Sequence, residues 1–158
     1  MVRSAALMVR LSGLLFWFDE SLQGSLTRSG FEPVSRTQSM FLLCLASGRN
    51  KPSQIADQLG VSRQTVSHII SSLSERGLIV LSTDPDDARG RIVDYSDSAQ
   101  DLRKAAHAIV NRLEMLLKQR IGANAFDSLC VGLANDWGEV AVIEPPPSKT
   151  PVTRRNKS

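Results

Sequence analysis

The sequence is poor in cysteine and histidine, which limits the chemistry that it can support. Its 158 residues include two cysteines, Cys44 and Cys130, and two histidines. Two cysteines are too few for a disulfide scaffold, and no cysteine or histidine recurs at metal-ligand spacing. Cys44 lies in the apolar run 40–46, where a thiol typically behaves as a small buried hydrophobe. We therefore expect no disulfide framework and no metal site.

Long apolar runs and catalytic motifs are also missing. No stretch approaches the roughly 20 continuous apolar residues of a membrane span. Near the N-terminus, Arg10 interrupts the apolar residues and Asp19 follows them at once, which is unlike a secretory signal. The sequence has no glycine-rich phosphate loop and no nucleophile elbow. We expect a cytoplasmic protein that is not an enzyme, needs no cofactor and does not associate with membranes.

The net positive charge is small and comes from the C-terminal end of the chain. The net charge is +3, and residues 144–158, with four basic residues and one acidic residue, account for the whole surplus. The rest of the chain is neutral, so an argument for nucleic-acid binding must rest on pattern rather than on charge. Residues 144–158 are proline-rich and lack an apolar pattern, which predicts a disordered basic tail.

Apolar residues recur at the spacing of one helix face in six segments. The expected helices cover about residues 5–28, 35–48, 51–60, 63–76, 98–120 and 123–142. Ser35 and Ser62 are expected N-caps, and Pro52 suits a first helical turn. Residues 78–81 and 91–95 flank the turn-rich segment 83–90 and predict a β-hairpin. The fold class is mainly α with a small β-wing.

Residues 52–73 carry the pattern of a helix-turn-helix. Ala56 is small where the two helices touch, and Gly60 permits the tight turn between them. Apolar residues at five further positions hold the helices at a steep angle: Ile55, Leu59, Val61, Val66 and Ile69. With the hairpin that follows, this segment predicts a winged helix-turn-helix.

The outer face of the second of these helices is built from hydrogen-bonding groups. Glutamine can pair with adenine and arginine with guanine, and serine, threonine and histidine can reach bases or phosphates. A solvated helix face is the alternative, but such faces are usually rich in lysine and glutamate. We therefore predict that this face reads double-stranded DNA through Arg63, Gln64, Thr65, Ser67, His68 and Ser71.

The tip of the hairpin contains three carboxylates close to two arginines. The carboxylates do not follow the spacing of a calcium loop. We expect Asp87 to brace Arg89, so that the guanidinium of Arg89 projects into a narrow minor groove, where the negative potential is enhanced. Arg91 is expected to meet a phosphate.

The run from about Val34 to Asp101 resembles the MarR family of winged-helix regulators. The matching positions are Gln38, the blocks 54–62 and 65–68, Leu73, 77–79 and the wing residues Asp84, Pro85, Asp87 and Arg89. The sequence departs from the family pattern at Ala88, where the first of two adjacent arginines is usual, at Leu81–Ser82 and at Ser96–Ala99. These departures imply fewer phosphate contacts.

The resemblance implies a homodimeric repressor that binds a pseudo-palindromic operator. It also implies release of DNA by a small aromatic or anionic effector, bound between the dimerisation helices and the winged domain. Phe16, Phe41 and Ile109 would border that pocket, although core packing is the alternative for all three.

The chain is expected to divide into a dimerisation helix (1–33), the winged domain (34–96), two further dimerisation helices (97–143) and the tail (144–158). An intrachain bundle is the alternative for the outer helices. A winged-helix protein-interaction module that no longer reads DNA is the alternative function, and salt-dependent, sequence-selective duplex binding separates the two.

Overall fold

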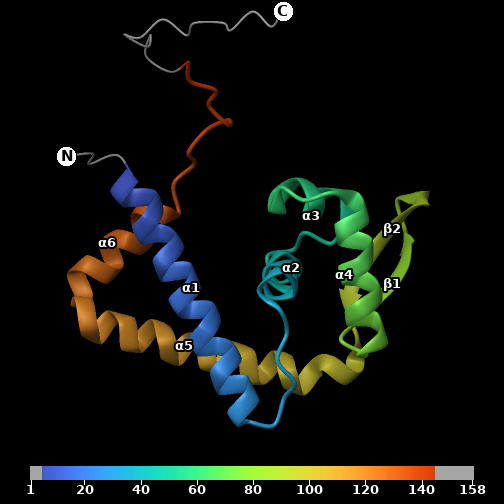
Figure 1. Ribbon diagram of the computed structural model, residues 1–158, viewed down its shortest axis with the longest axis horizontal. Coiled ribbons are helices and arrows are strands. Elements are labelled where there is room, and N and C mark those ends of the chain that lie inside the picture. Colours follow the sequence, from blue (N-terminus) through green and yellow to red (C-terminus); the bar gives the residue numbers. More distant parts are fainter. Residues whose placement is uncertain (1–4, 145–158) are drawn as a thin grey trace, which may run out of the picture.

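The computed structural model describes residues 5–144, and it is mainly helical with one two-stranded antiparallel sheet (Figure 1). The elements are α1 (Ala5–Arg28), α2 (Arg36–Ala46), α3 (Pro52–Leu59), α4 (Arg63–Glu75), β1 (Ile79–Asp84), β2 (Asp87–Tyr95), the short 3-10 helix η1 (Asp97–Ala99), α5 (Gln100–Ile121) and α6 (Ala123–Leu133). This confirms the predicted fold class. The predicted tail lies outside the described residues, apart from Glu144. None of the described helices is long and apolar enough to cross a membrane.

Local hydrogen bonds explain why the helices of the winged segment begin and end where they do. Ser35 and Gln38 form a reciprocal capping box at the start of α2. The Ser62 hydroxyl accepts a hydrogen bond from the Thr65 amide at 3.0 Å and caps α4. Gly60 ends α3 with φ of 64°, a left-handed conformation that glycine adopts without strain. Both predicted N-caps and the predicted turn glycine are therefore confirmed.

The hydrophobic core lies within the winged segment. Its fully buried side chains come from α2, α3, α4, β1 and β2, and they are Phe41, Ile55, Val66, Leu73, Ile79 and Val93. Cys44 is buried in the same cluster, as predicted, and burial raises the pKa of its thiol. The core thus fixes α4 against α2, α3 and the wing.

The strands of the wing extend further than the sequence indicates. The sequence predicts a turn over 83–90, but Asp84 already pairs with Asp87, and the connection narrows to two residues. The Asp84 carboxylate accepts a hydrogen bond from the Asp86 amide at 3.0 Å, and this bond closes the turn early. Thr83 pairs with Arg91, so residues 88–90 form an unpaired bulge in β2.

Three helices lie outside the winged core. α1 crosses and packs against α5, while α6 folds back from the end of α5 (Figure 1). α6 ends at Leu133, nine residues before the expected end at residue 142. Polar side chains after Leu133 explain the early end of the helix. The Asn135 side chain donates to the Val131 carbonyl at 2.9 Å, and the Asp136 carboxylate accepts from the Gly138 amide. These local bonds replace continued helical hydrogen bonding.

Candidate nucleic-acid interface

One face of α4 is buried and the opposite face is exposed. Val66, Ile69 and Leu73 are at most 8% exposed, because they pack into the core. Every α4 residue that the sequence predicts to contact DNA is exposed: Arg63, Gln64, Thr65, Ser67, His68 and Ser71. The structure therefore places these six side chains on one accessible surface, which we call the reading face.

The hydroxyl groups at the start of the reading face are engaged locally, whereas the longer side chains are not. Ser67 donates to the Arg63 carbonyl at 3.0 Å, and the hydroxyls of Ser62 and Thr65 lie 2.8 Å apart. Within residues 5–144, the side chains of Gln64 and His68 form no hydrogen bond. These two side chains keep their full hydrogen-bonding capacity for an external partner.

The predicted brace at the wing tip differs from the one that the structure shows. The Asp87 carboxylate accepts a hydrogen bond from the backbone amide of Arg89 at 3.0 Å, and it forms no ion pair with the Arg89 guanidinium in the described part of the chain. Asp87 thus contacts Arg89 through its backbone amide, which the short bulge brings within reach of the carboxylate, and the brace on the guanidinium stays a prediction. Arg89 and Arg91 are both exposed.

A cleft of about 410 Å³ separates the wing from the first turns of α3 and α4. It brings together Arg63 and Ser67 of α4 with Arg91 and Asp87 of the wing, four of the residues that the sequence singled out. Lys51 also lines the cleft, although no sequence pattern points to it. Asp84 and Asp87 line the same cleft and Lys51 is paired with Asp84, so Arg63 and Arg91 are the basic side chains suited to a phosphate backbone.

Lys51 forms a close ion pair at the edge of this cleft. Its ammonium nitrogen lies 2.6 Å from Oδ2 of Asp84, a side chain that is almost wholly buried. The hydrogen bond from Lys51, reinforced by that from the Asp86 amide, holds the pKa of Asp84 below its ordinary value. Asp84 is therefore ionised at neutral pH, and its pairing with Lys51 persists there.

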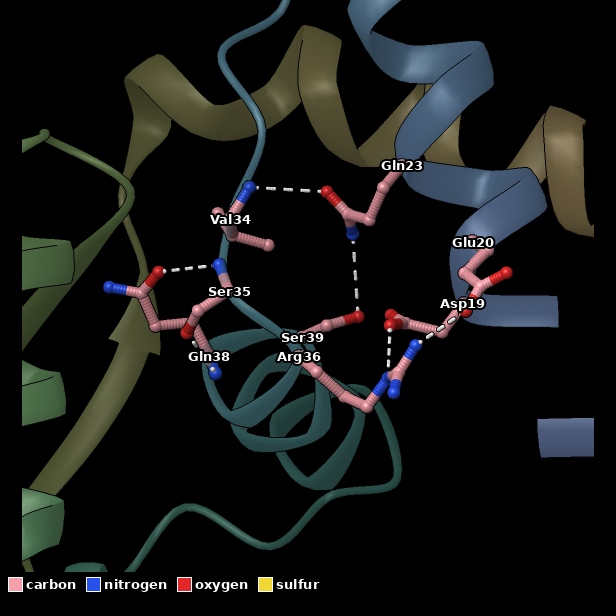
Figure 2. A network of polar contacts seen from close by, with 8 residues as sticks. All are labelled: Asp19, Glu20, Gln23, Val34, Ser35, Arg36, Gln38 and Ser39. Carbon is pink, nitrogen blue, oxygen red and sulfur yellow. Dashed lines mark hydrogen bonds and ion pairs between the residues drawn. The ribbon is translucent and has the colours of Figure 1, made fainter. Parts of the chain in front are cut away.

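A polar network connects α1 to the start of α2 (Figure 2). Arg36 donates to Asp19 at 3.0 Å and to Glu20 at 2.9 Å. Gln23 accepts from the Val34 amide at 3.1 Å and donates to Ser39. Asp19 is 6% exposed, and its second carboxylate oxygen has no hydrogen-bond partner among the described residues.

Hydrogen bonds also connect the start of α2 to α4, the helix that carries the reading face. Gln38, whose side chain closes the capping box with Ser35 (Figure 2), donates its amide to the Ser72 hydroxyl of α4 at 3.0 Å. α1 and α4 are thus connected through hydrogen bonds at the first turn of α2.

The three residues predicted to border an effector pocket lie in different surroundings. Phe41 is fully buried in the core of the winged segment, and Phe16 is 42% exposed on α1 with the Arg36 guanidinium 4.2 Å from its ring centre. Ile109 is half-buried on α5. Phe16 and Ile109 do not belong to the core cluster that contains Phe41. The effector pocket stays a prediction.

Gly90 offers a test of how tightly the wing is packed. A Cβ atom at this position would lie 3.1 Å from Cβ of Asp84 and 3.2 Å from the Asp87 carbonyl oxygen. Gly90→Ala is therefore expected to lower the free energy of unfolding by about 1–3 kcal/mol, as overpacking does. Gly24→Ala is the control, because nothing lies within 4 Å of its added Cβ in helix α1, and it should stabilise by about 0.5–1 kcal/mol. Urea denaturation of both variants measures these changes. Equal free energies of unfolding for the two variants would contradict the close packing at Gly90.

Comparison with known proteins shows which family the winged segment is similar to. Residues 33–90 match the model of the MarR family. No curated protein sequence matches the chain. Among solved structures, wild-type MarR from E. coli in its apo form is 17% identical, with a TM-score of 0.63, and the match covers 84% of this chain and 96% of that one.

Two further solved structures share the fold. CouR from Rhodococcus jostii RHA1, bound to p-coumaroyl-CoA, is 21% identical with a TM-score of 0.58, and the match covers 80% of this chain and 86% of CouR. A point mutant of S. aureus MepR, bound to an oligodeoxyribonucleotide, is 18% identical with a TM-score of 0.50, and the match covers 84% and 94% of the two chains. Likeness at these identities establishes a common fold.

Proposed function

Residues 33–90 match the model of the MarR family, and from that premise we propose that this chain is a member of the family and a homodimeric repressor that binds a pseudo-palindromic operator in double-stranded DNA. It acts in the cytoplasm by binding rather than by catalysis. The observation that carries the proposal is the reading face of α4, where six polar side chains are exposed beside a wing that presents Arg89 and Arg91. The solved MepR complex with an oligodeoxyribonucleotide supports DNA as the partner.

Exposed apolar side chains on the outer helices support the homodimer. α5 and α6 contain no buried residue in the single chain. Large hydrophobic residues are exposed at the start of α1 and in and beyond α6, and they include Leu7, Met8, Val9, Val131, Leu133 and Trp137. A second copy would cover this apolar surface. In the proposed division, residues 1–33 and 97–143 form the dimer and residues 34–96 bind DNA.

A small aromatic or anionic effector is part of the proposal. CouR, which shares the fold, was solved with p-coumaroyl-CoA, a molecule that is both aromatic and anionic. An effector that binds beside α1 more tightly in one arrangement of the dimer shifts the population toward that arrangement. The hydrogen bonds from Gln23 to Ser39 and from Gln38 to Ser72 offer a route by which such a shift reaches α4.

Selection of duplexes from a random library at moderate salt tests the function. We expect enrichment of a pseudo-palindrome whose half-sites lie about 10–10.5 bp apart, because two reading helices of a dimer enter successive major grooves. Sedimentation equilibrium of the same protein should give the mass of two chains. A folded dimer that enriches no motif would favour the protein-interaction module, which the neutral body and the single tip arginine beside Ala88 make the second candidate.

Arg89→Ala is expected to weaken binding to every duplex, by about tenfold where the sequence flanking the half-sites is rich in A·T pairs. The narrow minor groove of such flanks attracts the exposed guanidinium most strongly. Fluorescence anisotropy with A·T-rich and G·C-rich flanks measures the difference. Arg112→Ala, which removes an equal charge from an exposed position on α5, is the control, and once sedimentation equilibrium shows that this variant is still a dimer, neither affinity should change. Equal losses for both flanks would contradict the minor-groove role of Arg89.

A further inference from the structure

Asp84 is the buried anchor of the wing tip. Only 4% of the residue is exposed, and both of its carboxylate oxygens are engaged. Oδ1 accepts from the Asp86 amide at 3.0 Å within the turn, and Oδ2 accepts from Lys51 at 2.6 Å. The first bond shapes the turn itself. The second ties the turn to the N-terminal end of α3, which is 33 positions earlier in the chain.

The wing is joined to the helix-turn-helix at two points at different distances from its tip. Nearer the base, the Val93 amide donates to the Asn50 carbonyl at 2.9 Å. Nearer the tip, Lys51 pairs with Asp84, which lies three positions beyond Leu81, the β1 partner of Val93. The base of the hairpin is also held by Ile79 and Val93, which are buried in the core. The pair of Lys51 with Asp84 therefore adds an attachment nearer the tip to a base that is already packed against the core.

We propose that the Lys51–Asp84 ion pair orients the wing relative to the reading face of α4, and that Lys51 is a positioning residue for DNA binding. The inference rests on the proposed function, since the oriented surface is the one that meets DNA. The ion pair forms part of the wall of the cleft that separates Arg63 of α4 from Arg91 of the wing. It thereby sets the spacing between the residues expected in the major groove and those expected at the flanking backbone and minor groove.

Lys51 itself is not needed as a phosphate contact in this role. Its charge is already paired with a carboxylate at 2.6 Å, and Asp86 and Asp87 add further negative charge around it. A lysine compensated in this way attracts a phosphate less than an unpaired one does. Its effect on DNA should therefore pass through the arginines of the wing, and this distinguishes a positioning residue from a direct contact.

The first experiment measures the wing without DNA. Amide hydrogen exchange of residues 84–95 is compared between the full-length protein and Lys51→Met, which keeps the length of the side chain and removes the charge. We expect exchange in this segment to rise about tenfold while exchange in α5 is unchanged, because only the outer attachment is lost. Lys104→Met, at an exposed position on α5, is the charge-matched control and should leave the wing unchanged.

The second experiment is a double-mutant cycle on the duplex obtained by selection. Lys51→Met and Arg89→Ala are each expected to weaken binding about tenfold, and the double variant should lose little more than either alone, because both remove the same wing contact. Losses that multiply to about a hundredfold would show that Lys51 contacts DNA independently, and would overturn the inference. Lys51→Arg should restore most of the affinity, since its guanidinium can pair with Asp84.

The results of these experiments distinguish a failure of the positioning role of Lys51 from a failure of the proposed function on which it rests. If Lys51→Met proves unstable, Asp84→Asn tests the same ion pair from the other side while keeping an acceptor for the Asp86 amide. Unchanged exchange and unchanged affinity in both variants would overturn the positioning role while the repressor function stands. A wild-type protein that selects no duplex would refute the function, and the exchange experiment would still decide whether the ion pair holds the wing.

Discussion

A variant that carries both Gln64→Ala and His68→Ala is expected to lose most of its ability to distinguish its operator from other duplexes. Both side chains are exposed on α4 and are unpaired within residues 5–144. Each base contact that is removed should cost about 1–3 kcal/mol of discrimination. Affinity for unrelated duplexes should change little, because that affinity comes mainly from contacts between basic residues and phosphates.

The chain provides a control with the same two residue types. His107 and Gln119 are exposed on α5, so His107→Ala with Gln119→Ala removes the same two residue types away from the reading face, and sedimentation equilibrium checks that this variant is still a dimer. Competition binding at fixed salt gives the ratio of operator affinity to non-specific affinity for each variant. A ratio that stays at its wild-type value in the Gln64 and His68 variant would show that the reading face has been assigned to the wrong side of α4.

The reading face could be predicted because it depends on local periodicity. Once Val66, Ile69 and Leu73 are assigned to the core, a rotation of about 100° per residue places Gln64 and His68 on the opposite side. The caps were predictable for a similar reason, since Ser62 meets the Thr65 amide only three residues later. Interactions within one helical turn are encoded by neighbouring residues, and sequence spacing reveals them.

The arrangement of the wing could not be predicted from the spacing of residues in the sequence. Asp84, Asp86 and Asp87 look alike in sequence, but Asp84 is buried while the other two are exposed. The difference arises because Lys51, at the start of α3, reaches Asp84 across 33 positions of the chain. No periodic pattern links two such residues. Which of the three carboxylates is buried depends on this tertiary contact, and the brace of Arg89 by Asp87 stays a prediction.

The junction between α1 and α2 shows the same limit. In the sequence, Asp19 and Glu20 mark the polar end of an apolar run. In the structure Asp19 is buried and pairs with Arg36, while Glu20 pairs with the same guanidinium at the surface. Burial of a charge is tolerated where a partner compensates it. Which of two adjacent acids is buried depends on where Arg36 emerges from α2, and the sequence alone does not specify this.

Phe41→Ala is expected to lower the free energy of unfolding more than Gly90→Ala in the wing does. The side chain is fully buried in the core between α2, α3, α4 and the wing. Truncation of a buried phenylalanine lowers the free energy of unfolding by about 3–5 kcal/mol, because it removes buried apolar area and leaves a cavity. Domains of this kind are stable by only about 5–15 kcal/mol, so a substantial fraction of the total would be lost.

Leu43→Ala on the same helix is the control for Phe41→Ala, since Leu43 is 56% exposed and its truncation should cost no more than about 0.5 kcal/mol. Urea denaturation at one fixed protein concentration measures both variants, because dimerisation would make stability depend on concentration. A loss below about 1 kcal/mol for Phe41→Ala would mean that its ring borders an open pocket, as an effector site requires. A loss of several kcal/mol would make Phe41 a core residue whose replacement weakens DNA binding by unfolding the support of α4, and the search for an effector site would then move to Phe16 and Ile109.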